Sequence, residues 1–412
     1  MKKKYFIYLI LFLFSCSNFN HKNNGSIKEL PKNKIQKQIF CYNNNSVNYF
    51  LENENAINFY KKLKFTYNKN ILFSEKVALF LLHELIRRPD RVSPNSRIQL
   101  FIKLKNSENY FDSEDLIKTN NKMQYLQFIE YFLTTFSKNY NLKNILTLIE
   151  SNNFKTIPIS TEFYKFLKNN ENKIKENNFL AEHFLKGNEL LTQFETFKSN
   201  SLNSLLKNYS LKKEKLINSP LTFKNNYHEC NLEINNLKKD LFSKNYSNHN
   251  LGMLENENYF IATISTQLTP NLDNYYNSYF LKSIDIKEAT PICHFKNNIQ
   301  NLVLFSTSDR SPSQQLDHLI NYEIEKIDNF NSLEEILNFS RHLFLKAPDR
   351  IIYESKKGKK SQLEFFQSLN IPIYHIEELG QIVGVGSFKN SGKYINSLII
   401  DQRGEAKIEC NN

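Results

Sequence analysis

Residues 74–88 read SEKVALFLLHELIRR, and this stretch decides how the first half of the chain folds. Its apolar side chains recur at helical spacing and cover nearly every face of a helix. A helix that is apolar all round is buried among other elements. Pro89 ends it, because proline cannot continue a helix. The sequence therefore predicts a central, buried helix over residues 74–88.

On both sides of this helix the apolar period stays helical, from about residue 48 to residue 241. Ser93 as N-cap and Pro94 at the first helical position predict that a second helix follows, with Ile98, Leu100 and Phe101 on its apolar side. Further helices are expected over residues 123–136, 142–149 and 163–167. These segments predict an all-helical domain over residues 48–242.

After residue 251 the pattern changes to strands that alternate with helices. Strands are expected over residues 259–265, 291–295, 301–306, 350–354, 371–376 and 381–388. Helices are expected from Ser311, from Ser332 and over 361–369, the first two opened by capping boxes. Residues 397–401 and 406–410 should form a closing hairpin, with Arg403-Gly404 as its turn.

The sequence therefore predicts an α-helical N-terminal domain plus a mixed α/β (α+β) C-terminal domain over residues 251–412, built on a mixed sheet. The Asn-rich, weakly apolar stretch 243–250 marks the expected boundary between the two domains.

The first fifteen residues have the pattern of a secretory signal peptide. Lys2, Lys3 and Lys4 precede an apolar run over residues 5–14 and then Ser15. The run is too short to span a bilayer, which takes about 20 residues. Export is therefore expected.

Leu13-Phe14-Ser15-Cys16 resembles the lipobox of bacterial lipoproteins. This resemblance implies cleavage before Cys16 and attachment of diacylglycerol and palmitate there. It also implies an exported protein held at a membrane of the bacterial cell envelope or periplasm, in a leaflet that the sequence does not indicate. Residues 16–47 are rich in Asn, Lys and Ser, which predicts a flexible tether.

The formal charge of the 412 residues is +12, of which the signal lysines supply three. A basic chain can bind nucleic acid, anionic lipid or acidic polymers. The lysines are spread along the chain, and the single dense cluster, Lys356-Lys357-Gly358-Lys359-Lys360, is interpreted as a solvated loop. An exported protein has little access to nucleic acid, so no nucleic-acid partner is expected. No cofactor is expected either.

Four cysteines besides Cys16 suggest two disulfides in an oxidising compartment. They are Cys41, Cys230, Cys293 and Cys410. The favoured pairing is Cys293 with Cys410 and Cys41 with Cys230, although reduced, buried cysteines are the alternative.

His83-Glu84 resembles the start of a zinc-binding helix motif. That motif needs a second histidine one turn later, so that both face one metal. Arg87 and Arg88 stand there instead. No metal site is expected.

Residues 383–401, VGVGSFKNSGKYINSLIID, resemble the strand–Gly-Ser–Asn stretch of phospholipase D-type enzymes. In that family a His-x-Lys motif supplies the nucleophilic histidine. His294-Phe295-Lys296 matches it, whereas His375 is followed by Glu377 in place of the lysine. The resemblance implies candidate residues for phosphodiester chemistry, namely His294, Lys296, His375 and Ser387. Without a lysine beside His375, it implies a degenerate relative.

These observations are compatible with two functions. The favoured one is a lipid-anchored binding or structural protein of the cell envelope, with a protein or envelope polymer as partner and no enzymatic activity. The alternative is a degenerate phospholipase D-like or other envelope hydrolase. It requires His294 and His375 to lie side by side in one pocket with Ser387.

Overall fold

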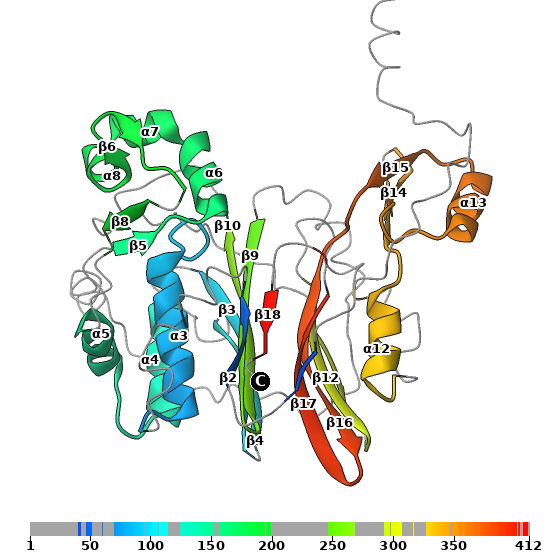
Figure 1. Cartoon of the computed structure of the whole chain (residues 1–412), viewed down its shortest axis with the longest axis horizontal. Helices are drawn as coiled ribbons and strands as arrows, with labels where there is room; N and C mark the ends of the chain where they lie inside the picture. The colour runs from blue at the N-terminus through cyan, green and yellow to red at the C-terminus, as the bar shows by residue number, and fades with distance from the viewer. Residues whose placement is uncertain are drawn as a thin grey trace, which may run out of the picture.

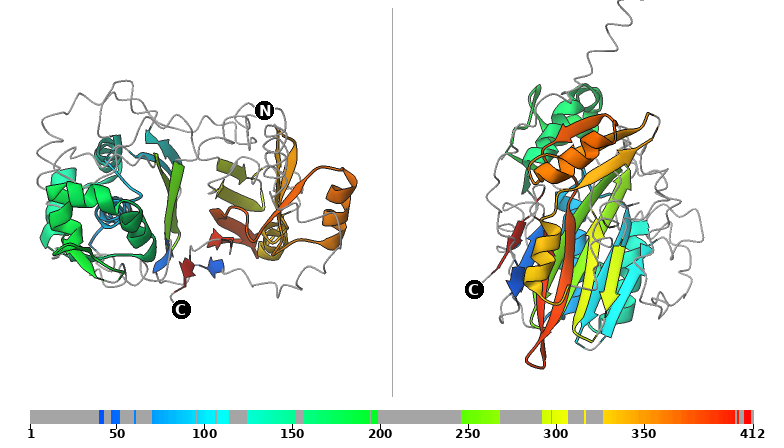
Figure 2. Two further views of the ribbon diagram at one scale, coloured as in Figure 1. Left: turned by 90° about the horizontal axis from the view of Figure 1, so that it is seen from above. Right: turned by 90° about the vertical axis from the view of Figure 1, so that its right-hand side faces the viewer.

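A computed structural model describes residues 40–42, 47–51, 60, 70–113 except 95 and 106, 124–151, 156–198 except 194, 246–267, 292–306 except 297, 316, 327–401 except 347, 403 and 407–410. Two β-sheets lie face to face, and helices cover the outer face of each (Figure 1). Seen from above, the layers run helix, sheet, sheet, helix (Figure 2).

The first sheet has six strands in the order β18-β2-β9-β10-β3-β4, each antiparallel to its neighbours. Their bounds are β2 Val47–Leu51, β3 Arg97–Leu104, β4 Ser107–Asp112, β9 Tyr246–Glu255, β10 Asn258–Gln267 and β18 Lys407–Glu409. The sheet thus combines strands from the beginning, middle and end of the chain.

The second sheet has five antiparallel strands in the order β1-β17-β16-β12-β11. Their bounds are β1 Phe40–Tyr42, β11 Ile292–Lys296, β12 Gln300–Ser306, β16 Ile382–Asn390 and β17 Lys393–Ile400. Apolar side chains of both sheets form one core between them, including Phe101 and Ile261 from the first sheet and Val303 and Leu398 from the second.

Helices α3 Phe73–Arg87 and α4 Gln124–Phe136 cover the outer face of the six-stranded sheet, and α5 Leu142–Ser151 packs against these two helices. Every residue of α3 is buried, which confirms the predicted central helix. A smaller group extends this layer upward in Figure 1. It consists of β5 Thr156–Pro158, α6 Thr161–Asn169, α7 Glu171–Glu176, α8 Asn178–Phe184, β6 Leu185–Lys186, β7 Glu189–Leu190 and β8 Thr196–Lys198.

The prediction of a separate all-helical N-terminal domain is wrong. The segment expected to form its second helix is strand β3, in the middle of the six-stranded sheet. Ile98 and Leu100 pack under the helices, whereas Phe101 packs against the second sheet. A strand buried on both faces has a nearly continuous apolar sequence, which does not distinguish it from a buried helix.

The predicted boundary at residues 243–250 falls at the start of β9. β9 pairs with β2, and β10 pairs with β3 over seven residues, so the two halves of the chain share one sheet. The α/β C-terminal domain expected over residues 251–412 is therefore part of the same sandwich.

Several predicted elements of the C-terminal half are confirmed with small shifts at their ends. They are β10, β11, β12, β16, β14 Arg350–Glu354, α13 Lys360–Ser368 and β15 Ile373–Ile376. The helix expected from Ser332 as far as Pro348 is wrong in its second half: α12 Phe330–Leu337 ends at Leu337, and strand β13 His342–Leu345 follows. The helix expected from Ser311 lies outside the described residues apart from Leu316. α12 packs on the outer face of the five-stranded sheet through Leu333 and Leu337.

The predicted closing hairpin is wrong. β17 pairs with β16 in one sheet, while β18 crosses to the other sheet and pairs with β2. Arg403, expected in an exposed turn, is completely buried.

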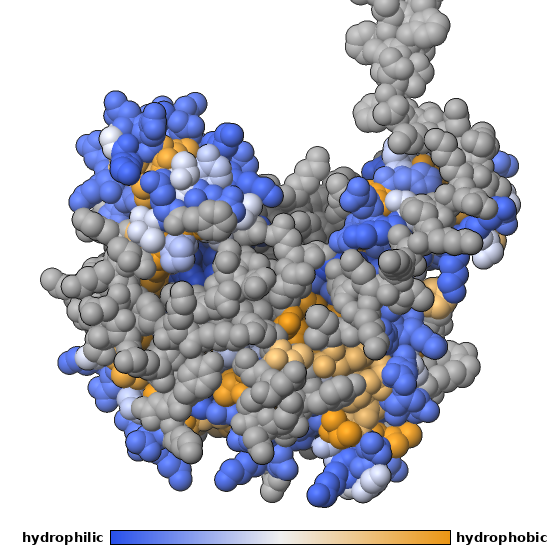
Figure 3. Space-filling model, viewed as in Figure 1, coloured by the Kyte–Doolittle hydropathy of each residue, from blue (hydrophilic) through white to orange (hydrophobic). Residues whose placement is uncertain are grey.

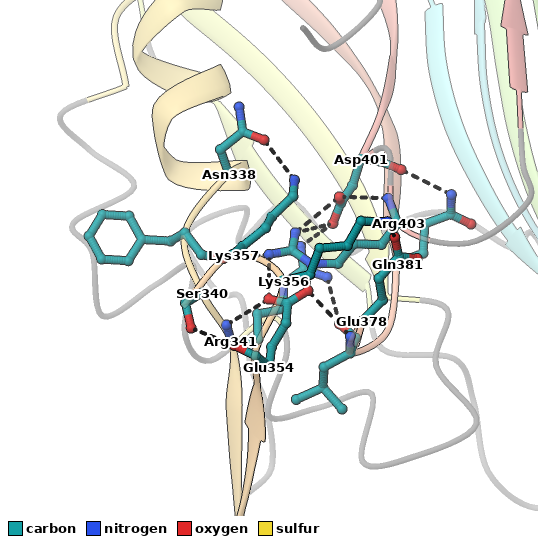
Figure 4. Close-up of polar contacts among 12 residues, drawn as sticks. Asn338, Ser340, Arg341, Glu354, Lys356, Lys357, Glu378, Gln381, Asp401 and Arg403 are labelled. Atoms are coloured by element: carbon teal, nitrogen blue, oxygen red, sulfur yellow. Dashed lines mark hydrogen bonds and ion pairs between the residues drawn. The ribbon is translucent and has the colours of Figure 1, made fainter. Parts of the chain in front are cut away.

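Arg403 lies at the centre of an ionic network, the Arg403 network, which Figure 4 shows. Its guanidinium donates to the Glu354 carboxylate at 2.5 and 2.8 Å and to the Asp401 carboxylate at 2.9 and 3.0 Å. Arg341 also donates to Asp401. The Leu337 carbonyl at the end of α12 and the Phe339 carbonyl just beyond it also accept hydrogen bonds from the guanidinium.

The Arg403 network fixes a small module to the sandwich. The module comprises β13 His342–Leu345, β14, α13 and β15, with β14 and β15 parallel to each other. Glu354 ends β14, whereas Asp401 follows β17 of the five-stranded sheet. The carboxylates that share Arg403 therefore belong to the two bodies that it joins.

Cys293 and Cys410 each form a disulfide, but not with one another as predicted. Cys293 lies on β11, at one edge of the five-stranded sheet. The Cys410 sulfur lies 3.9 Å from the carbonyl oxygen of Phe40 in β1, at the other edge. Three strands separate these edges, a distance of about 19 Å at about 4.8 Å per strand. A disulfide needs Cα atoms within about 7 Å.

We expect the bonds Cys41–Cys410 and Cys230–Cys293 instead. Cys41 belongs to β1, the strand beside Cys410, while Cys16 and Cys230 lie outside the described residues. If Cys16 is acylated, Cys230 is the remaining partner for Cys293. Mass mapping of non-reduced peptides checks this pairing, and a peptide joining Cys293 to Cys410 would contradict it.

The predicted signal peptide and most of the tether, residues 1–39, also lie outside the described residues. Among the helices that the structure describes, none is both long and apolar enough to cross a bilayer.

Candidate functional site

Buried ionisable side chains gather where α3 ends and β9 begins. Glu84, in the last part of α3, is completely buried. Its carboxylate accepts from Tyr60 at 2.6 Å and from Arg87 at 2.6 and 3.0 Å. It also meets His249 Nε2 of β9 at 2.5 Å. These four residues are called the Glu84 cluster.

The Glu84 cluster holds an ionised carboxylate inside the protein. Burial by itself would raise the pKa of Glu84, but the charge of Arg87 and hydrogen bonds from His249 and Arg87 bring it well below its ordinary value. A carboxylate can only accept, so His249 carries a proton on Nε2. The neighbouring His83 is neutral, because burial lowers its pKa to about 3.

A second ion pair follows the helix stop at Pro89. Arg88 binds Asp90 through two N–H groups at 2.8 Å each, and both side chains are buried. Burial would raise the pKa of Asp90, but Arg88, Arg91 and the nearby His249 lower it. The Glu84 cluster and this pair therefore occupy one corner of the molecule.

The six-stranded sheet has an inner face that packs against the other sheet. The buried side chains on this face are apolar along most of the strands, but they are polar at the end where β3 begins and β10 ends. They form the inner polar row: Arg97, Gln99, Asp112, Thr263 and Ser265. Arg97 binds Asp112 at 2.6 and 2.8 Å, and Thr263 hydrogen-bonds Asn250 of β9.

Both polar groups lie at the end of the sandwich where β9 begins, here called the β9 end. Ser247 is the second residue of β9 and precedes His249 by two positions. In the register of the hairpin, Ser247 lies opposite Thr266 and Asn248 opposite Ser265. A hydroxyl residue thus opens the strand that carries the buried histidine.

This arrangement provides the elements of nucleophilic acyl transfer. Such chemistry needs a hydroxyl or thiol nucleophile, a base, and polar groups that stabilise developing charge. A carboxylate that fixes a histidine is a recurring part of such sites. Among the described residues, no group of three or more His, Cys, Asp or Glu side chains is placed so that it could hold a metal ion.

The residues suggested by the phospholipase D resemblance lie elsewhere. His294 is buried in β11, with Nε2 2.7 Å from the Asn301 side-chain oxygen, and burial lowers its pKa. Lys296 pairs with Glu108 of β4 at 2.8 Å. Ser387 donates to Asn396 at 2.6 Å. They lie at the end of the sandwich opposite to the β9 end.

His375 lies in β15 of the small module, on an exposed position beside Tyr353. The structure therefore assigns His294 and His375 to different sheets and does not unite them with Ser387. The Gly-Ser stretch itself is the middle of β16. A Cβ at Gly384 would lie 2.2 Å from the Val303 carbonyl oxygen, so this glycine serves close packing of strands.

Sequence reasoning missed Glu84, His249 and Ser247. One signal was available: a glutamate within an otherwise apolar helix must find a partner, because an unpaired buried charge is very costly. Residues 248–250, Asn-His-Asn, were interpreted as an exposed boundary because they are weakly apolar. Their partners are distant in sequence, which a local pattern cannot reveal.

Two solved structures share this fold over nearly their whole length. Cephalosporin acylase from Bacillus halodurans matches 94% of this chain and 99% of its own, with a TM-score of 0.51 and 7% sequence identity. The protein LmbA2991T421A matches 91% of this chain and 99% of its own, with a TM-score of 0.58 and 7% identity. No family model and no curated protein matches the sequence.

At such low identity the likeness shows the fold alone, a sandwich of two β-sheets with helices on both outer faces. This finding overturns the expected non-enzymatic binding or structural role, and with it the expectation that the chain is not an enzyme. Those expectations rested on the lack of a local catalytic motif, and a site assembled from distant strands leaves none.

Proposed function

We propose that this chain is an acyl-transfer enzyme that cleaves amide bonds with an N-terminal nucleophile. The observation that carries the proposal is the start of β9. There, in a sandwich fold shared with an acylase, a serine is the second residue of the strand that carries His249 of the buried Glu84–His249 pair. Fold alone does not determine function, so the residues of the β9 end supply the chemical argument.

Ser247 is the proposed nucleophile. Cleavage of the Tyr246–Ser247 peptide bond by water would leave a carboxylate on Tyr246 and free the α-amino group of Ser247. An α-amino group has a pKa of about 7.7–8.0, which suits a general base near neutral pH. Pairing of a nucleophile with its own N-terminal amine is an established form of activation.

The reaction then follows ordinary acyl transfer. The Ser247 hydroxyl adds to the acyl carbonyl and its proton passes to the leaving amine, which departs as the acyl ester forms. Water, or an acceptor amine, attacks the ester and regenerates the serine. His249, which Glu84 fixes and which lies two positions farther along β9, provides a polar group near this position that needs no reorganisation.

Turnover of amide substrates by the purified protein tests the proposal. Chromogenic acyl anilides and a cephalosporin side-chain amide are suitable probes, because one structural neighbour is an acylase of that class. We expect release of the amine together with cleavage of the chain before residue 247. An intact chain that neither hydrolyses these amides nor becomes acylated by a serine-directed reagent would contradict the proposal.

We further propose that the enzyme is exported and lipid-anchored through Cys16, which is supported by the signal pattern and the lipobox resemblance. Two or three acyl chains hold a protein stably at a membrane, at about 0.8 kcal/mol per buried CH₂.

The variant Cys16→Ala should carry no fatty acid and should remain unprocessed or leave the membrane fraction. Labelling with radioactive palmitate and fractionation after a carbonate wash check this prediction. A labelled variant that still sediments with membranes would refute the anchor, and Cys230→Ala controls for loss of a cysteine elsewhere.

A further inference from the structure

We propose that the end of the sandwich opposite to the β9 end docks on an anionic lipid surface. This hairpin end comprises the turns that connect β3 to β4, β9 to β10, β11 to β12 and β16 to β17; the tips of β4 and of the β16–β17 hairpin are lowest in Figure 1. The proposal concerns a surface remote from the candidate site, and it uses the proposed lipid anchor only to bring that surface near a membrane.

The β16–β17 hairpin projects a fully exposed tip. All six residues from 389 to 394 are exposed. Ser391 and Gly392 form a two-residue turn in which both φ angles are positive, +49° and +83°, the geometry of a tight type I′ turn. The tip therefore presents Lys389, Lys393 and Tyr394 on a well-defined support.

The neighbouring β11–β12 turn completes the patch. The Tyr394 hydroxyl donates to the Asn298 carbonyl at 3.3 Å, and the Lys389 backbone N–H donates to the Ile299 carbonyl at 2.8 Å. Ile299 and Tyr394 are each 47% exposed, among the few large hydrophobic side chains that reach the surface. We call Ile299, Lys389, Lys393 and Tyr394 the docking patch. Figure 3 shows hydrophobic and hydrophilic atoms side by side at this lower end.

The charges of the hairpin end favour an anionic partner. Its carboxylates Glu108 and Glu255 are paired with Lys296 and Lys76, which leaves Glu257. Lys105, Lys389 and Lys393 are exposed, and within the described ranges no carboxylate pairs with them. Three lysines against Glu257 therefore leave an excess of positive charge among the described residues of this end.

The other exposed hydrophobic group lacks this charge complementarity. Phe344 and Phe365 reach the surface of the small module. Two lysines of this module are engaged by carboxylates, Lys356 by Glu378 and Lys360 by Glu364 at 3.9 Å. For an anionic bilayer the docking patch is thus the better surface. Its lysines would meet headgroups, and its tyrosine has the amphipathic character of interfacial aromatics.

Docking in this orientation would turn the β9 end away from the membrane.

Twenty-four positions separate Cys16 from Phe40, where the described fold begins, and a chain of that length reaches up to about 80 Å when extended. An anchored molecule would meet the bilayer at high effective concentration, so a weak patch is sufficient.

Vesicle binding tests the proposal independently of the anchor and of catalysis. The full chain carrying Cys16→Ser, which cannot be acylated there, is mixed with phosphatidylcholine vesicles with or without phosphatidylglycerol. We expect sedimentation with the anionic vesicles only, and release at high salt as screening increases. In that background, Lys389→Gln with Lys393→Gln should weaken binding about 25-fold, since each lysine contributes about fivefold.

The matched control is Lys165→Gln with Lys168→Gln, which removes two exposed lysines of α6 far from the patch. Undiminished binding by the hairpin variant, an equal loss in the α6 variant, or equal binding to neutral vesicles would overturn the docking surface. Amide hydrolysis measured on the same preparations separates this outcome from failure of the proposed function, because neither pair of lysines belongs to the β9 end.

Discussion

Replacing Ser247 with alanine is expected to abolish both chain cleavage before residue 247 and amide hydrolysis. The variant lacks the hydroxyl that forms the acyl ester, and binding groups alone leave only residual catalysis. The loss in kcat should be at least about a thousandfold. Separation of the chain by mass and release of amine from an acyl anilide measure the two effects.

Two further variants test whether the loss of activity is specific to Ser247 and whether the Glu84 charge contributes to catalysis. Ser361→Ala changes an exposed serine of α13 and should leave both activities unchanged. Glu84→Gln keeps the shape of the side chain but removes the charge that faces His249 and Arg87. It should reduce turnover and shift its pH profile, while a role confined to stability would leave that profile in place. Full activity of Ser247→Ala would exclude this serine as the nucleophile.

Replacing Arg403 with methionine is expected to produce the largest loss of stability. Methionine is apolar, so the variant would leave Glu354 and Asp401 buried without the guanidinium that both share. Removing one partner of a buried ion pair costs about 3–5 kcal/mol. The midpoint of thermal unfolding should fall by about 4–6 °C, at about 1.2 °C per kcal/mol for a chain of about 400 residues.

Controls distinguish geometry from charge at this site. Arg403→Lys retains the charge but cannot bind two carboxylates and two carbonyls at once, so it should also be strongly destabilised. Lys360→Met removes an exposed charge of α13 and should have little effect. If Arg403→Met unfolds at the temperature of the parent, the small module is held by other contacts.

The pH dependence of Arg403→Met follows from Asp401. Burial would raise the pKa of this carboxyl, but Arg341 and Arg403 lower it below its ordinary value. Its contribution is therefore present above the unfolded pKa of about 3.9 and is lost as the pH falls through the lower folded value. Without Arg403 the folded pKa is higher, so acid unfolding should begin at a higher pH, as melts between neutral and acidic buffers would show.

Local sequence patterns were sufficient for elements whose environment is simple. The buried helix 74–88 was predicted because its apolar residues surround the axis and Pro89 stops it. The strand over residues 350–354 was also predicted correctly, between turn-forming residues. Both are governed by interactions within a few residues, which a period in the sequence reflects directly.

β3 could not be predicted in this way. Its alternate residues Ile98, Leu100 and Ile102 follow a two-residue period, but Phe101 is also apolar because a second sheet covers the other face. The closing hairpin failed for a related reason. Arg403-Gly404 is a pair of residues typical of a hairpin turn, yet β18 pairs with the other sheet. The Arg403 side chain is bound by the carboxylates of Glu354 and Asp401.

The sequence by itself was sufficient to place several helices, such as residues 74–88, and some strands, and it contains the signal pattern that predicts export. The tertiary structure alone decided that strands near residues 50, 100, 260 and 408 form one sheet. It also decided that Glu84 meets His249 across 165 positions of sequence. Burial makes such a charged contact obligatory, but only the packed chain determines which partner satisfies it.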